Sequence, residues 1–112
     1  MKTKFILSAM LCCAVPALAA PPAGIDLSYD SSKKTLHVSA RHPSDRLDRY
    51  YIRKIVIYKN DTADDEVTFS RQKLASGIEE DIAYEAKPRD VIKVEIFASE
   101  GGKGSAEYEV PQ

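Results

Sequence analysis

The chain has 112 residues, with 16 basic and 17 acidic side chains, two cysteines and no tryptophan. A chain of this length suits one domain with one hydrophobic core. Because a nucleic-acid binder needs a net basic face, the slightly acidic composition argues against nucleic acid as a partner.

The first residues have the pattern of a cleavable export signal. Lys2 and Lys4 form a positive start, residues 5–14 are almost entirely apolar, and Ala17-Leu18-Ala19 is a small-x-small cleavage motif. We therefore expect a signal peptide over residues 1–19, cleavage after Ala19, and a periplasmic or secreted mature protein. The apolar run is too short to span a bilayer, and no second one follows it, although an uncleaved anchor is the alternative.

Both cysteines lie inside this leader. A lipoprotein attachment site needs a small residue before the cysteine, whereas Leu11 precedes Cys12. We interpret Cys12 and Cys13 as apolar residues of the signal peptide. After cleavage, no thiolate remains for a disulfide, a metal site or a nucleophile.

The mature chain begins with two alternating segments. Residues 20–24 predict a flexible lead-in, and residues 25–112 predict a single β domain. Residues 25–30 and 36–41 alternate apolar and polar side chains, the pattern of half-buried strands, around a polar turn. These two segments predict a hairpin.

The middle of the chain contains the strongest strand signal. Residues 42–49 break the alternation, because Pro43 lacks an amide hydrogen. Residues 50–59 are rich in β-branched and aromatic side chains and predict a central strand. An acidic turn over 60–65 and a short strand over 66–70 are expected to follow.

The last third predicts three more strands, over 82–86, 91–98 and 106–110. A glycine-rich turn over 101–104 joins the last two. Residues 72–78 fit a loop or one helical turn, and the pattern does not define 71–80. Seven or so short strands without a helix predict an all-β, immunoglobulin-like antiparallel sandwich.

Only two histidines are available for chemistry. His37 and His42 are separated by an odd number of residues on an extended segment, so they are expected to face opposite ways. His37 is expected in solvent, and no catalytic residue is predicted. The acidic segments 61–66 and 79–81 are interpreted as solvated charge.

A basic cluster surrounds the loop over residues 42–49. It offers a candidate surface for a protein partner in the periplasm, since clustered cations attract an acidic surface. Ordinary surface charge, balanced by Asp45 and Asp48, is the alternative. The candidate partner-binding residues are Arg41, Arg46, Arg49, Tyr50 and Tyr51.

Two stretches carry a family resemblance. Residues 41–60 read RHPSDRLDRYYIRKIVIYKN, and residues 87–110 read KPRDVIKVEIFASEGGKGSAEYEV. They resemble desulfoferrodoxin and superoxide reductase domains, in which a His-Pro step precedes His-Tyr-Ile, and Lys-Pro-Gly-Asp precedes a strand and a Cys-Asn-x-His-Gly turn. The resemblance implies an immunoglobulin-like sandwich that holds, in that family, a mononuclear iron on four histidines and one cysteinate.

Matched position by position, the resemblance leaves one iron ligand. His42 matches the His-Pro histidine, but Tyr50 replaces the second histidine, Ala98 the cysteine, and the last histidine falls near Gly101. One histidine does not hold a metal that needs several nitrogen and sulfur donors. Together with the export signal, the resemblance therefore predicts an exported, non-catalytic binding or accessory module without a cofactor, with iron as the alternative.

Two other functions stay open. An atypical mononuclear iron protein or other metal-binding oxidoreductase would use His37, His42, Tyr50 and a nearby carboxylate. An accessory subunit of a sulfur-oxidation system is the other possibility, because its carrier-binding subunit is similarly an exported sandwich with a His-Pro stretch.

Overall fold

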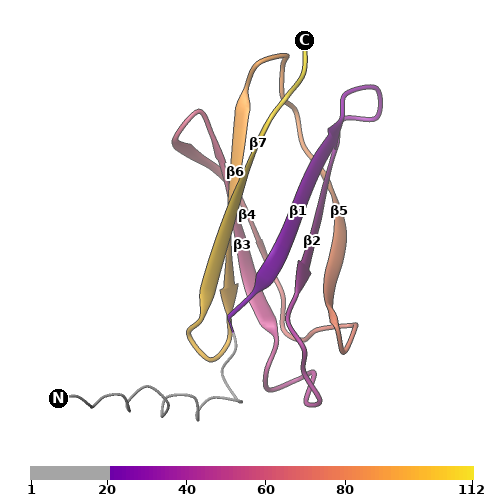
Figure 1. The fold of residues 1–112 in the computed structure, drawn as a ribbon, viewed down its shortest axis with the longest axis vertical. Helices are drawn as coiled ribbons and strands as arrows, with labels where there is room; N and C mark the ends of the chain where they lie inside the picture. The colour runs from indigo at the N-terminus through magenta and orange to yellow at the C-terminus, as the bar shows by residue number, and fades with distance from the viewer. Residues whose placement is uncertain (1–20) are drawn as a thin grey trace, which may run out of the picture.

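The computed structural model describes residues 21–112, so the predicted signal peptide and its cleavage site lie outside the described residues. The predicted all-β fold with seven antiparallel strands is confirmed (Figure 1). No helix in residues 21–112 is long and apolar enough to cross a membrane. The strands are β1 (Ala23–Asp30), β2 (Thr35–Arg41), β3 (Ile52–Lys59), β4 (Thr62–Thr68), β5 (Gly77–Ala83), β6 (Val91–Ala98) and β7 (Lys103–Glu109).

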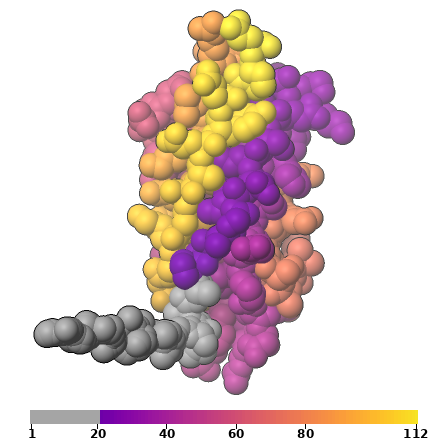
Figure 2. Space-filling model, viewed as in Figure 1, coloured from indigo at the N-terminus to yellow at the C-terminus, as the bar shows by residue number. Residues whose placement is uncertain are grey.

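The strands form two sheets. The first has the order β1-β2-β5, and the second has the order β4-β3-β6-β7. Every pairing is antiparallel. β1 and β7 lie side by side and join the two sheets along one flank, which Figures 1 and 2 both show. β4 and β5 are the free edges of the other flank.

The core lies between the two sheets. Alternate residues of β2 and β6 point inward, because successive side chains of a strand face opposite ways. In β3, a register shift between Ile52 and Lys54 lets Ile52 point inward together with Ile55 and Ile57. These strands are rich in isoleucine and valine, which pack well on a pleated surface. The fully buried apolar side chains are Leu36, Val38, Ile52, Ile55, Ile57, Ile92, Val94 and Ile96.

The β3–β4 hairpin corrects the acidic turn predicted over residues 60–65. Asn60 and Asp61 both have positive φ, 50° and 71°, which makes a tight two-residue turn that lets β4 begin at Thr62. Asp64 and Asp65 therefore lie on an exposed edge strand. Charged side chains on such an edge discourage pairing with other chains.

β5 corrects the prediction for residues 72–86. The strand is Gly77–Ala83 rather than 82–86, and no helical turn forms before it. Gly77 has φ of 152°, and a Cβ there would collide with the carbonyl oxygen of Ala40. A glycine is required at this point because β5 enters its pairing with β2 at close backbone approach.

The first and the last strand both begin earlier in the sequence than the periodicity predicted. β1 begins at Ala23, within the segment interpreted as a flexible lead-in, and Pro22 is buried. β7 begins at Lys103, within the predicted glycine-rich turn. A Cβ on Gly104 would lie 2.7 Å from the carbonyl oxygen of Pro22. Gly104 thus lets the start of the described chain pack against β7.

Candidate functional site

Three loops meet at the end of the sandwich that carries the His-Pro step, at the bottom of Figure 1. They are residues 42–51, 69–76 and 99–102. Backbone hydrogen bonds join the first two loops, from the amide of His42 to the Ser76 carbonyl (2.9 Å) and from the amide of Gln72 to the Leu47 carbonyl (2.9 Å). These two loops therefore form one surface.

His42 lies at the centre of this end, and only 1% of it is exposed. Its Nδ1 is 2.9 Å from Oε1 of Gln72, and its Nε2 is 2.9 Å from Oε2 of Glu100. Glu100 comes from the turn after β6, and Gln72 comes from the loop before β5. Both ring nitrogens are therefore engaged by protein side chains.

The Gln72 amide fixes the tautomer of His42. Its Nε2 donates to the carbonyl oxygens of His42 and Leu74, both at 2.8 Å, so its Oε1 is the atom that faces the imidazole. Oε1 also accepts from the amide of Ile52 at 3.0 Å. An amide oxygen only accepts, so Nδ1 of His42 carries a proton.

Ser99 ties the third loop to the same cluster. Its hydroxyl donates to the Arg49 carbonyl at 2.8 Å and accepts from the Tyr51 amide at 3.1 Å. Its own amide donates to the Tyr51 carbonyl at 2.8 Å. These bonds position Glu100, the next residue, over the imidazole of His42.

His37 is separated from this cluster, as its spacing predicted. It lies on the outer face of β2, with 47% of its side chain exposed, and its Nδ1 contacts Oδ1 of Asp81 at 2.6 Å. His42 faces the interior. The two histidines therefore do not converge, which removes the geometry that the atypical metal protein required.

The predicted partner-binding residues all lie at or near the His42 end. Arg46 and Arg49 are exposed, and Tyr50 and Tyr51 are half-buried. The Arg49 guanidinium lies 5.7 Å from the centre of the Tyr50 ring. Arg41 is also exposed, and its side chain lies over Gly24 of β1, where a Cβ would be 3.3 Å from its Nε. Their role in binding stays a prediction.

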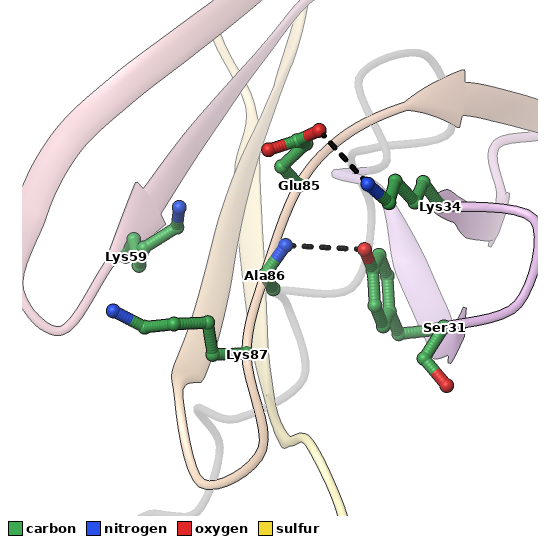
Figure 3. A pocket seen from close by; sticks show the side chains of 7 residues that line it. Ser31, Lys34, Lys59, Glu85, Ala86 and Lys87 are labelled. Atoms are coloured by element: carbon green, nitrogen blue, oxygen red, sulfur yellow. Dashed lines mark hydrogen bonds and ion pairs between the residues drawn. The ribbon is translucent and has the colours of Figure 1, made fainter.

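A cavity of about 330 Å³ opens at the opposite end (Figure 3). Lys34 pairs with Glu85 at 3.3 Å, and Tyr29 accepts a hydrogen bond from the Ala86 amide at 3.1 Å. Lys59, which also lines the cavity, has a carboxylate 3.8 Å away. Because two of its three lysines are paired, this cavity has little excess charge to attract an anion.

Tyr84 lies beside this cavity and is buried under β4. Burial, together with a hydrogen bond of 2.7 Å to the Asp64 carboxylate, raises the pKa of Tyr84 well above that of a free phenol. The hydroxyl therefore stays protonated and ties the edge strand to the segment after β5. This role is structural.

Comparison with known proteins identifies the fold. No protein-family model and no curated protein matches the chain. Among solved structures, a superoxide reductase (neelaredoxin) from Ignicoccus hospitalis superposes with a TM-score of 0.56, over 82% of each chain and at 16% sequence identity. The chain has a superoxide-reductase-like fold. At that identity the likeness concerns the fold alone, and it confirms the fold part of the predicted resemblance.

The donors at this end do not fit the iron of the superoxide reductase family. Ala98 is buried without a donor, and Gly101 has no side chain. His42 is already bonded at both nitrogens. Within residues 21–112, no three histidine, cysteine or acidic side chains are grouped so that they would hold a metal ion. Iron in such sites needs several nitrogen and sulfur donors.

Two residues of the cluster were missed by sequence reasoning. Gln72 sat in the segment with no regular pattern, and Glu100 followed a predicted strand as one charged residue among many. They lie 30 and 58 residues from His42 along the chain. A buried histidine needs partners for both nitrogens, which was the one signal that pointed to such residues.

Proposed function

We propose that this chain is an exported, non-catalytic, superoxide-reductase-like domain that acts as a binding or accessory module. One observation carries the proposal: His42, the single ligand position retained from the resembling family, is bonded to Gln72 and Glu100. The histidine thus serves the fold instead of a metal.

The hydrogen bonds of His42 make a metal-binding role costly. A metal would have to displace Gln72 from Nδ1 or Glu100 from Nε2. Displacing Gln72 would also leave the Ile52 amide without its hydrogen-bond acceptor. A buried polar group without a partner lowers the stability of the fold by about 1–3 kcal/mol. Displacing Glu100 would expose Nε2 to a site with one carboxylate and no thiolate, a poor donor set for iron.

The binding role is assigned to the loop surface around His42. Exposed arginines and half-buried tyrosines are suited to contacts with another protein, because such side chains combine charge with a rigid apolar body. Export would place this contact in the periplasm. The residues assigned to it are Arg41, Arg46, Arg49, Tyr50 and Tyr51.

The test is to express the full chain, recover the exported protein, and measure its N-terminus, its iron and zinc content and its consumption of superoxide. We expect an N-terminus at Ala20, metal far below one atom per chain, and superoxide loss at the uncatalysed rate. Stoichiometric iron that is lost in His42→Ala, together with catalysed superoxide loss, would overturn the proposal.

A further inference from the structure

Charge is divided very unevenly over the described chain. Residues 41–54 and 69–76, here called the basic end, carry seven basic and two acidic side chains. The rest of residues 21–112 carries seven basic and fifteen acidic ones. The basic side chains of the basic end are Arg41, Arg46, Arg49, Arg53, Lys54, Arg71 and Lys73.

The basic end continues onto the outer face of the four-stranded sheet around Phe97. Three cations surround this ring, with Arg53 at 5.7 Å, Lys54 at 4.9 Å and Lys103 at 5.8 Å from its centre. Lys103 is paired with Glu95 at 3.7 Å. Within residues 21–112, no carboxylate lies within 4.0 Å of the charged groups of Arg53 or Lys54. Their charge is therefore available to a partner.

The basic end is held in one shape by backbone contacts. The amide of Phe69 donates to the Arg53 carbonyl at 2.9 Å, which fixes the 69–76 loop to the start of β3. The buried side chain of Gln72 then joins this loop to His42. A surface that is already ordered loses little conformational entropy when a partner binds.

We propose that the basic end and Phe97 dock an acidic segment of a partner protein, an inference that rests on the proposed function and names its partner class. Carboxylates of the segment would pair with Arg53 and Lys54, and its apolar side chains would cover Phe97 and Tyr50. A rigid cationic and aromatic surface of this kind matches a short segment that mixes acidic and apolar residues.

The acidic remainder of the chain favours a short protein segment over an extended polyanion. A membrane surface or a nucleic acid that extended beyond the basic end would also meet carboxylates of the edge strand β5, because Glu79 and Glu80 line one hollow with Lys73. Like charges repel such a surface. A segment that contacts only the basic end avoids this repulsion.

The probe is a short fluorescein-labelled peptide of alternating glutamate and leucine, with a lysine-and-leucine peptide as its control. Binding is followed by fluorescence anisotropy with the protein recovered from expression of the full chain. The test variant is Arg53→Glu with Lys54→Glu. The matched control is Lys33→Glu with Lys87→Glu, which makes the same change of charge at the opposite end. Arg46→Glu with Arg49→Glu is a second test variant, and its peptide binding is measured if the first variant fails to fold.

We expect the acidic peptide to bind, the lysine peptide not to bind, and the test variants to weaken binding about tenfold at low salt. The control should stay within about twofold of the parent. Phe97→Leu, which keeps apolar bulk without the aromatic face, should weaken binding less than charge reversal does.

Four results would overturn the inference. Two come from anisotropy: no binding of the acidic peptide, or equal losses of affinity in the test and control variants. The other two are binding of anionic phosphatidylglycerol vesicles in place of the peptide, and self-association in sedimentation that the test variant abolishes. Iron and zinc are measured on the same preparations. Failure of peptide binding in metal-free protein overturns this inference alone, whereas stoichiometric iron overturns the proposed function.

Discussion

Replacing Gln72 with leucine tests the hydrogen-bond cluster directly. Leucine is similar in volume to glutamine, so the substitution removes the hydrogen bonds with little change in packing. It leaves Nδ1 of His42, the carbonyl oxygen of His42 and the amide of Ile52 without partners. Each of these groups is buried.

The expected loss follows from the number of orphaned groups. A buried donor or acceptor without a partner costs about 1–3 kcal/mol, so three of them cost at least about 3 kcal/mol. For a domain of this size, that loss lowers the midpoint of thermal unfolding by roughly 12 °C or more. Such a loss is a large share of a typical domain stability of about 5–15 kcal/mol.

Urea denaturation and thermal melting, both followed by circular dichroism, measure this loss. Lys73→Leu is the matched control, because it makes a leucine at the adjacent, exposed position and should change stability by no more than about 0.5 kcal/mol. A loss below about 1 kcal/mol for Gln72→Leu would show that the cluster does not hold the loops together.

Three further predictions concern the histidines, Tyr84 and two glycines. His42→Ala should cost about 2–4 kcal/mol in urea denaturation, whereas His37→Ala, at an exposed contact, should cost about 0.5 kcal/mol or less. Because the pKa of Tyr84 is raised, its contribution to stability is complete below the pKa of a free phenol, about 10, and is lost as pH rises beyond it. Tyr84→Phe should therefore flatten the fall of stability with alkaline pH, and an unchanged slope would refute this. In thermal melting, Gly77→Ala should lower the free energy of unfolding by more than about 3 kcal/mol. Gly101→Ala should lower it by about 1 kcal/mol, because a Cβ there meets open space but φ is 107°.

The strands that form the core were predictable from the sequence. β2 and β6 alternate buried with less buried residues, β3 does so from Ile55 on, and the bounds of all three differ from the prediction by at most two residues. Burial enforces this alternation, because a shift by one residue would turn the apolar side chains to solvent. The separation of His37 and His42 followed from the same periodicity.

The errors occurred where local geometry outweighs side-chain pattern. β4 and β5 are edge strands with carboxylate runs, and acidic residues are poor indicators of a strand. The turn at Asn60 and Asp61 takes two residues because both adopt positive φ, which asparagine and aspartate tolerate. Gly104 belongs to β7 because Pro22 packs against it, and no local pattern encodes that contact.

The cluster around His42 was only half predictable. The His-Pro step marked the histidine, but its partners come from two other loops that tertiary folding brings together. Glutamine and glutamate are most often solvent-exposed, so neither is singled out by composition. The lack of a side-chain donor at Ala98 and Gly101 could be read from the sequence, whereas the hydrogen bonds of His42 to Gln72 and Glu100 could not.

The most direct measurement of the central claim is a long-range proton–nitrogen correlation spectrum of the His42 ring. We predict a protonated Nδ1 and ring signals that are the same in a chelator and in stoichiometric zinc or ferrous iron, because Gln72 and Glu100 engage both nitrogens. His37 provides the internal reference on the exposed face. A metal-induced shift or paramagnetic broadening of the His42 signals, with those of His37 unchanged, would contradict the claim.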